Sequence, residues 1–209
     1  MKALHRADIA LPTDHAAPGL PDGFARQALS LAMQVLDRAE LGQRPVDMCL
    51  ALSQVARSLK ALGAFAAAET YLGQALRWSR LLPGVDAQVD LMSELAEVSC
   101  AAAEAEQAAS EDDRHAGRAA RERARDHAFE AAALAGQTTD AHWEVKVLLR
   151  VSDVLDRCGD HDDAASMQNR AITLMGLGGL ASESDQGASL HEAALELPVV
   201  MAPGSTLLM

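Results

Sequence analysis

The stretch LKALGAFAAAETYLGQALRW, from Leu59 to Trp78, changes character at Gly63. On both sides of this glycine, apolar residues recur every three or four positions, which is the spacing of one face of an α-helix. Glycine accepts the left-handed backbone conformation that commonly ends a helix. The stretch therefore predicts two helices joined by a tight turn, with alanines where the helices must approach closely.

The composition extends this prediction to the whole chain of 209 residues, of which 49% are hydrophobic and only 3% aromatic. Alanine and leucine dominate, and these residues favour helices over strands. All seven prolines lie outside the segments with helical periodicity. We expect an all-α protein with six or seven helices between these breaks.

The expected helices occupy residues 22–40, 46–62, 65–82, a segment beginning at Asp86, 118–135, 140–158 and 162–175. Between the fourth and fifth lies Ala103–Gly117, whose second half is acidic and predicts an exposed loop. The chain then divides into a flexible N-terminal segment (1–21), a helical domain (22–175), and a linker with a short helix and an apolar tail (176–209).

The same spacing recurs later in the chain. Leu52, Val55, Leu59, Gly63 and Ala68 have counterparts in Leu148, Val151, Leu155, Gly159 and Ala164. A poorer copy lies between them, with Met92, Leu95 and Ala96 in its first helix and Ala124, Ala128, Ala131 and Ala132 in its second.

Residues 46–175 resemble the tetratricopeptide repeat, in which antiparallel helix pairs stack upon one another. The chain departs from that family at His161 and Gln168, where large apolar residues are usual. The resemblance implies a right-handed α-solenoid of about three antiparallel helix pairs, with an additional N-terminal helix and a C-terminal tail. It also implies a concave groove, lined by the first helix of each pair, that holds a peptide or helix of another protein.

The resemblance places the groove beside the core stripe of each first helix, and it implies the partner-binding residues. They are Ser53, Arg57 and Lys60 in the first pair, Ser93, Glu97 and Cys100 in the second, and Leu149, Asp153 and Asp156 in the third. Such a groove would run from basic to acidic. Ordinary solvated side chains are the alternative interpretation at each position.

Only CGDHDD, residues 158–163, has the composition of a metal or catalytic site. Adjacent residues at a helix start point in different directions, and helix capping by Asp160 or Asp162 explains the same acids. No phosphate-binding loop or nucleophile motif is present in the sequence. We expect no catalytic residue, no metal and no cofactor.

A formal net charge of −12 disfavours binding to nucleic acid and to anionic membranes. Cys49, Cys100 and Cys158 are far apart and form no CxxC motif, which indicates a reducing compartment. Residues 1–23 contain no apolar run that would serve as a signal sequence. The predicted location is the cytoplasm.

These observations favour a non-enzymatic adaptor that binds another protein. The alternatives are a chaperone for a secreted or signalling partner protein and a regulatory module acting in trans, while an enzyme is the least favoured class. A homodimer is one open alternative for its assembly. The apolar tail, Leu197–Met209, either caps the last repeat or occupies the groove until a partner displaces it.

Overall fold

A computed structural model describes residues 22–107 and 111–176 of the chain. These ranges contain seven helices and no strand, so the predicted all-α class is confirmed. The helices are α1 (Asp22–Gly42), α2 (Pro45–Ala61), α3 (Phe65–Ser79), α4 (Asp86–Gln107), α5 (Glu111–Ala135), α6 (Ala141–Cys158) and α7 (His161–Leu174). The C-terminal tail, on which two expectations rested, lies outside the described residues.

The loop predicted for the second half of Ala103–Gly117 is wrong, because α4 continues to Gln107 and α5 already begins at Glu111. Gly117 lies inside α5 and is buried. A Cβ atom at this position would lie 3.4 Å from the Ala103 carbonyl oxygen and 3.4 Å from the Glu106 Cβ. The glycine therefore permits a close approach of α5 to α4, where the sequence analysis took it as the end of a loop.

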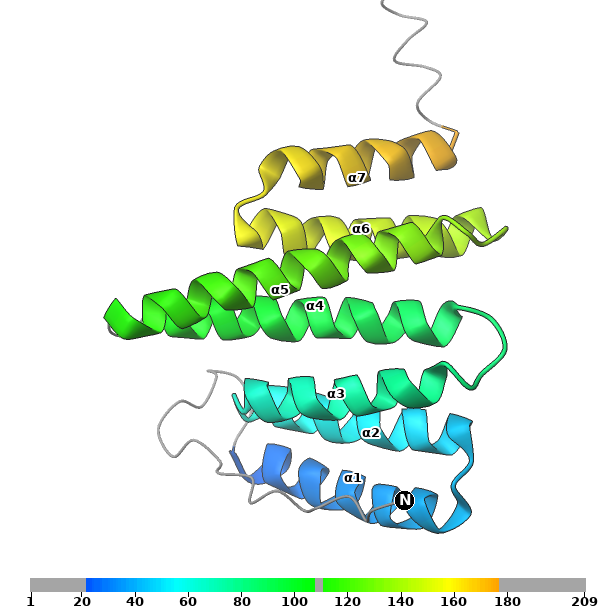
Figure 1. Cartoon of the computed structure of the whole chain (residues 1–209), viewed down its shortest axis with the longest axis vertical. Helices are drawn as coiled ribbons and strands as arrows, with labels where there is room; N and C mark the ends of the chain where they lie inside the picture. Colours follow the sequence, from blue (N-terminus) through cyan, green and yellow to red (C-terminus); the bar gives the residue numbers. More distant parts are fainter. Residues whose placement is uncertain (1–21, 108–110, 177–209) are drawn as a thin grey trace, which may run out of the picture.

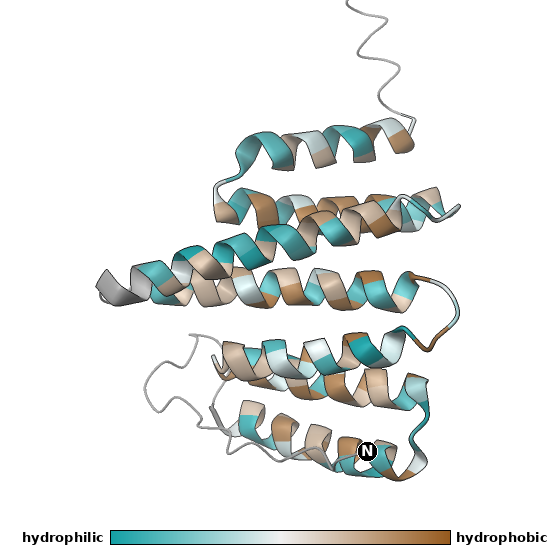
Figure 2. Cartoon of the chain, in the orientation of Figure 1, coloured by the Kyte–Doolittle hydropathy of each residue, from teal (hydrophilic) through white to brown (hydrophobic). Residues whose placement is uncertain are grey.

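The helices follow one another along the long axis of the molecule in chain order (Figure 1). Each helix contacts the next one in the chain, and α4 also contacts α6 directly. Teal and brown residues interleave along every helix (Figure 2), as expected for helices that bury one face and expose another.

Two large clusters of buried side chains form the core, and α4 contributes to both. The first cluster joins α1, α2 and α3 to Leu91, Leu95 and Val98 of α4. The second joins α5, α6 and α7 to another face of α4, which carries Val89, Met92, Ala96 and Cys100. Because α4 is buried on two sides, only one narrow face of it remains open to solvent.

Helix α5 packs largely through alanines, with Phe129 and Leu134 as partly buried large side chains. Its buried alanines, each at most 3% exposed, are Ala120, Ala124, Ala128, Ala131, Ala132 and Ala135. Side chains this small allow the helix axes to approach closely and still fill the space between them.

The turns after α2 and α6 have the same backbone hydrogen bonds. Gly63 and Gly159 have positive φ angles of 73° and 90°. After α2, the Ala64 N–H donates to the Leu59 carbonyl at 2.9 Å; after α6, the Asp160 N–H donates to the Leu155 carbonyl at 2.9 Å. Each glycine N–H donates to the carbonyl three residues earlier, which completes a Schellman motif in both turns.

Replacing Gly159 with Ala should lower the free energy of unfolding by about 1–2 kcal/mol, because an L-residue is strained in the left-handed region. Gly73→Ala is the matched control. Gly73 lies inside α3, where an added Cβ meets nothing within 4 Å, so this change should stabilise by about 0.5–1 kcal/mol. Urea unfolding of both variants measures the two changes in the free energy of unfolding. Changes of the same sign would contradict the assigned turn geometry.

Ala68→Leu should destabilise the protein by about 1–3 kcal/mol through overpacking, because Ala68 of α3 is fully buried against α2. Ala66→Leu places the same side chain two positions earlier, on the exposed face of α3, and little change in stability is expected there. Thermal and urea unfolding would measure both variants. An unchanged stability for Ala68→Leu would show that the α2–α3 contact is looser than described.

Candidate functional site

The solvent-exposed face of α4 is acidic. Asp90, Glu94, Glu97 and Glu104 are spaced three, four or seven residues apart and therefore lie on one side of the helix. The other sides of α4 are occupied by the two core clusters. The acids thus fill the only strip of this helix that packing leaves free.

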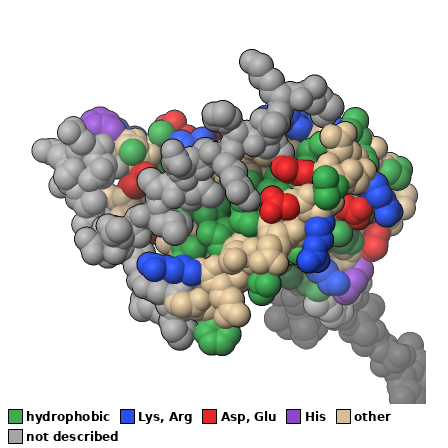
Figure 3. All heavy atoms as spheres, turned by 90° about the horizontal axis from the view of Figure 1, so that it is seen from below, with side chains coloured by type: hydrophobic (Ala, Val, Ile, Leu, Met, Phe, Trp, Pro, Cys, Tyr) green, Lys and Arg blue, Asp and Glu red, His purple; other side chains and the backbone are tan. Residues whose placement is uncertain are grey.

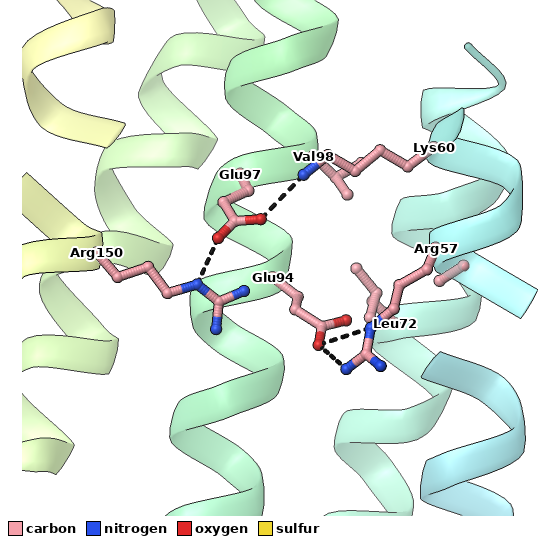
Figure 4. A pocket seen from close by; sticks show the side chains of 8 residues that line it. Arg57, Lys60, Leu72, Glu94, Glu97, Val98 and Arg150 are labelled. Atoms are coloured by element: carbon pink, nitrogen blue, oxygen red, sulfur yellow. Dashed lines mark hydrogen bonds and ion pairs between the residues drawn. The ribbon is translucent and has the colours of Figure 1, made fainter. Parts of the chain in front are cut away.

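Cations from the two neighbouring helices pair with this acidic strip. From α2, Arg57 binds Glu94, with its Nε 3.1 Å from Oε1, and the Lys60 ammonium donates to Glu97 at 2.9 Å. From α6, Arg150 donates through Nε to the other oxygen of Glu97. Figure 4 shows Glu97 held between Lys60 and Arg150, with the Glu94–Arg57 pair beside it.

Further along α4, Arg157 of α6 forms a two-pronged contact with Glu104, through bonds of 2.9 and 2.8 Å. We call this surface the α2–α4–α6 wall. It comprises Val46, Leu50, Arg57 and Lys60 of α2, Asp90, Glu94, Glu97 and Glu104 of α4, and Leu149, Arg150, Asp153 and Arg157 of α6.

A depression of about 140 Å³ lies in the wall between these ion pairs. Ala56, Leu72 and Val98 provide its apolar lining, and the charged lining comes from Arg57, Lys60, Glu94, Glu97 and Arg150 (Figure 4). Glu94 is only 8% exposed, and its second oxygen, Oε2, is buried without a hydrogen-bond partner among the described residues. This oxygen is therefore an unsatisfied acceptor beneath the surface of the wall, next to the depression.

The carboxylates of the strip differ in their proton affinity. Burial favours a raised pKa for Glu97, but hydrogen bonds from Arg150 and Lys60 outweigh burial, and its pKa is lowered. Burial raises the pKa of Asp90, and the attraction of Arg150 only partly offsets it. The Arg57 guanidinium has a raised pKa because it donates to Glu94. The wall therefore stabilises Glu97 as an anion, and it does the same for Glu104, whose pKa is lowered by the hydrogen bond from Arg157.

Arg57, Lys60 and Glu97, three of the residues expected in a groove, come together on this wall. Ser53 does not line its surface, because it is 7% exposed and its hydroxyl donates to the Cys49 carbonyl at 2.8 Å. Ser93 and Cys100 are likewise buried, at 2% and 1% exposure. On α4, the charged residues that line the depression are instead Glu94, which follows Ser93, and Glu97.

On α6, Leu149 is 46% exposed and Asp153 lies 3.7 Å from Arg157. Asp156 lies on the same side of α6, seven residues after Leu149, and its carboxylate contacts the His161 ring nitrogen at 2.7 Å. The expected gradient from basic to acidic is wrong, because Arg150 and Arg157 make α6 partly basic and the acids concentrate on α4.

Four residues that form ion pairs on the wall were not predicted from the sequence: Glu94, Glu104, Arg150 and Arg157. A signal for them was present, since the acids of α4 recur at helical spacing and the two arginines of α6 are seven residues apart. Recognising their pairing requires knowing that α4 and α6 lie side by side, which no local pattern gives.

The acids at residues 160–163 do not form a metal site. Asp160 occupies the N-cap position of α7 without a side-chain cap hydrogen bond, which corrects the expectation of capping by its carboxylate. Its Oδ2 instead lies 2.8 Å from Nε of Arg125 on α5, and Asp163 lies 3.7 Å from the same guanidinium. Within 22–107 and 111–176, no group of three His, Cys, Asp or Glu side chains is placed to hold a metal ion.

No protein family model matches the chain, and no curated protein sequence matches it. Among the helices described, none is both long and apolar enough to cross a membrane. The function of the wall must therefore be argued from its own geometry.

Glu97→Gln should lower the free energy of unfolding at pH 7 by about 1–2 kcal/mol, because it removes a charge that two cations share. The folded state holds the pKa of Glu97 below its unfolded value of about 4.3. The stabilisation is therefore complete above about pH 5 and is lost as the pH falls through the folded pKa. Wild type and variant should converge in stability at acid pH.

Glu130→Gln is the control, because Glu130 is an exposed acid of α5 that is not part of the wall. Its stability at pH 7 should differ little from wild type, as is usual for exposed positions. If the difference for Glu97→Gln did not change with pH, the carboxylate would stabilise by its shape and not by its charge.

Proposed function

We propose that this protein is a non-enzymatic adaptor that binds a segment of another protein on the α2–α4–α6 wall. In this proposal the helices form a right-handed α-solenoid similar to tetratricopeptide repeats, with α2–α3, α4–α5 and α6–α7 as its pairs and α1 preceding them. The wall then corresponds to the concave groove of that family.

Three observations support the solenoid. The turns after α2 and α6 are Schellman motifs at corresponding positions of the two best-matching repeats. Helices α4 and α6, the first helices of successive pairs, contact each other directly. Ion pairs join α2 to α4 and α4 to α6, so the first helices share one surface.

The observation that carries the adaptor proposal is the mixture of groups on the wall. Val46 and Leu50 are 48% and 59% exposed on the face of α2 that also carries Arg57, and Leu149 is 46% exposed on α6. The same wall carries the depression lined by Arg57, Lys60, Glu94, Glu97 and Arg150. Apolar anchors beside charged groups suit a peptide or helix that packs its apolar side chains on the wall and pairs its polar groups with these charges.

The test uses a double variant, Leu50→Ala with Leu149→Ala, in the tagged full chain expressed in its native cell. Proteins that co-purify with wild type are identified and their affinity is measured with purified components. The variant should bind such a partner about tenfold more weakly or worse, which corresponds to about 1.4 kcal/mol. Its stability should change by no more than about 0.5 kcal/mol, as is usual for exposed positions.

The matched control is Leu81→Ala with Ile172→Ala, which removes exposed apolar side chains (65% and 40%) outside the wall. It should bind like wild type. Equal weakening by both double variants would mean that binding follows general surface hydrophobicity, and unchanged binding by the wall variant would refute the proposed site.

A chaperone for a secreted or signalling protein is the second candidate, favoured by the apolar stripe on α1. Phe24, Leu31 and Val35 share one side of this helix and are 67%, 55% and 39% exposed. Figure 3 shows hydrophobic side chains among charged ones on the α1 end of the molecule. This candidate requires that Phe24→Ala with Leu31→Ala abolish protection of an unfolded client against aggregation, while the wall variant retains it.

A further inference from the structure

Two of the three cysteines lie together in the fold although they are far apart in the sequence. Cys100 is on α4 and Cys158 is the last residue of α6, two helices in direct contact. Cys100 is 1% exposed, and the partly exposed Cys158 packs against the same core cluster. Solvent can therefore reach one sulfur, and the other lies behind it.

Charged side chains surround this pair. The Cys100 thiol lies 3.8 Å from Glu104, which is held by both prongs of Arg157, the residue next to Cys158. A hydrogen bond between the Cys100 and Cys158 side chains is the main cause that lowers the pKa of Cys158. Arg121 of α5 and Arg157 also favour the thiolate, whereas burial and Asp160 oppose it.

The same hydrogen bond and burial raise the pKa of Cys100, so the pair is asymmetric, with Cys158 as the more acidic thiol. The third cysteine, Cys49, has no such environment. It is buried, its thiol contacts the Ala75 carbonyl at 3.4 Å, and burial raises its pKa.

We propose that Cys100 and Cys158 form a peroxide-sensitive site, in which Cys158 reacts first with a hydroperoxide and Cys100 then closes a disulfide between α4 and α6. This inference is independent of the proposed adaptor function.

The chemistry balances with hydrogen peroxide as the oxidant. The Cys158 thiolate attacks one peroxide oxygen, so that an S–O bond forms, the O–O bond breaks, and the departing hydroxide takes up a proton to become water. The Cys100 sulfur then attacks the Cys158 sulfenic acid. An S–S bond forms, the S–O bond breaks, and the hydroxyl leaves as a second water with the Cys100 proton.

The experiment treats the reduced, desalted full chain with hydrogen peroxide, blocks the remaining thiols, and maps the peptides by mass spectrometry. The expected product is a peptide pair linked by a disulfide between Cys100 and Cys158. Cys49 should remain an unoxidised thiol and therefore carry the blocking group. In the Cys100→Ser variant, Cys158 should accumulate as a sulfenic acid that dimedone traps. In Cys49→Ser, the linked pair should form as in wild type.

The wild-type map decides the question even if a variant folds poorly, and circular dichroism checks each variant. Oxidation of Cys158 no faster than Cys49 would overturn the proposal. So would a disulfide that joins two molecules, detected by its dependence on protein concentration, or trapping of the sulfenic acid on Cys100 before Cys158.

The oxidised protein should also melt at a higher temperature than the reduced protein, because the bond ties together two helices separated by the whole of α5. Addition of dithiothreitol should reverse the shift. A bond that lowers the melting temperature would show that the thiols do not face each other in the native fold, and the site would be rejected.

Discussion

The structure depends on the packing of α4 between two cores. Its apolar residues point in two directions, toward α1–α3 through Leu91 and Leu95 and toward α5–α7 through Met92 and Ala96. The remaining strip carries carboxylates, which would repel one another if left alone. Arginines and a lysine from α2 and α6 compensate them, so the polar wall is a direct consequence of how α4 is buried.

Local features of the fold could be predicted from the sequence because they depend on neighbouring residues. Gly63 and Gly159 end their helices through a conformation that glycine adopts easily, and the apolar spacing around them placed α2, α3, α6 and α7 to within a few residues. Gly117 misled the prediction because its role comes from outside its own segment. Its lack of a side chain matters only where Ala103 and Glu106 of α4 lie against it.

The wall could be predicted only in part for the same reason. The α2 cations share a surface with Glu97, but their pairing with α4 was not predicted, and Arg150 was not recognised because its role depends on Glu97. Ser53 shows the opposite error, since it has the right helical position yet lies buried at 7% exposure. Periodicity gives the direction in which a side chain points, whereas packing between helices decides whether it reaches solvent.

The alanine face of α5 has a mechanical consequence. Alanine has no side-chain rotamers to rearrange, so α5 has few interlocking groups that resist sliding along α4 and α6. Small shear displacements of packed helices are a recognised way in which proteins adjust their shape. Sliding of α5 along α4 would therefore meet less steric resistance than sliding of α3 along α2, where Leu52, Leu59 and Leu72 interlock.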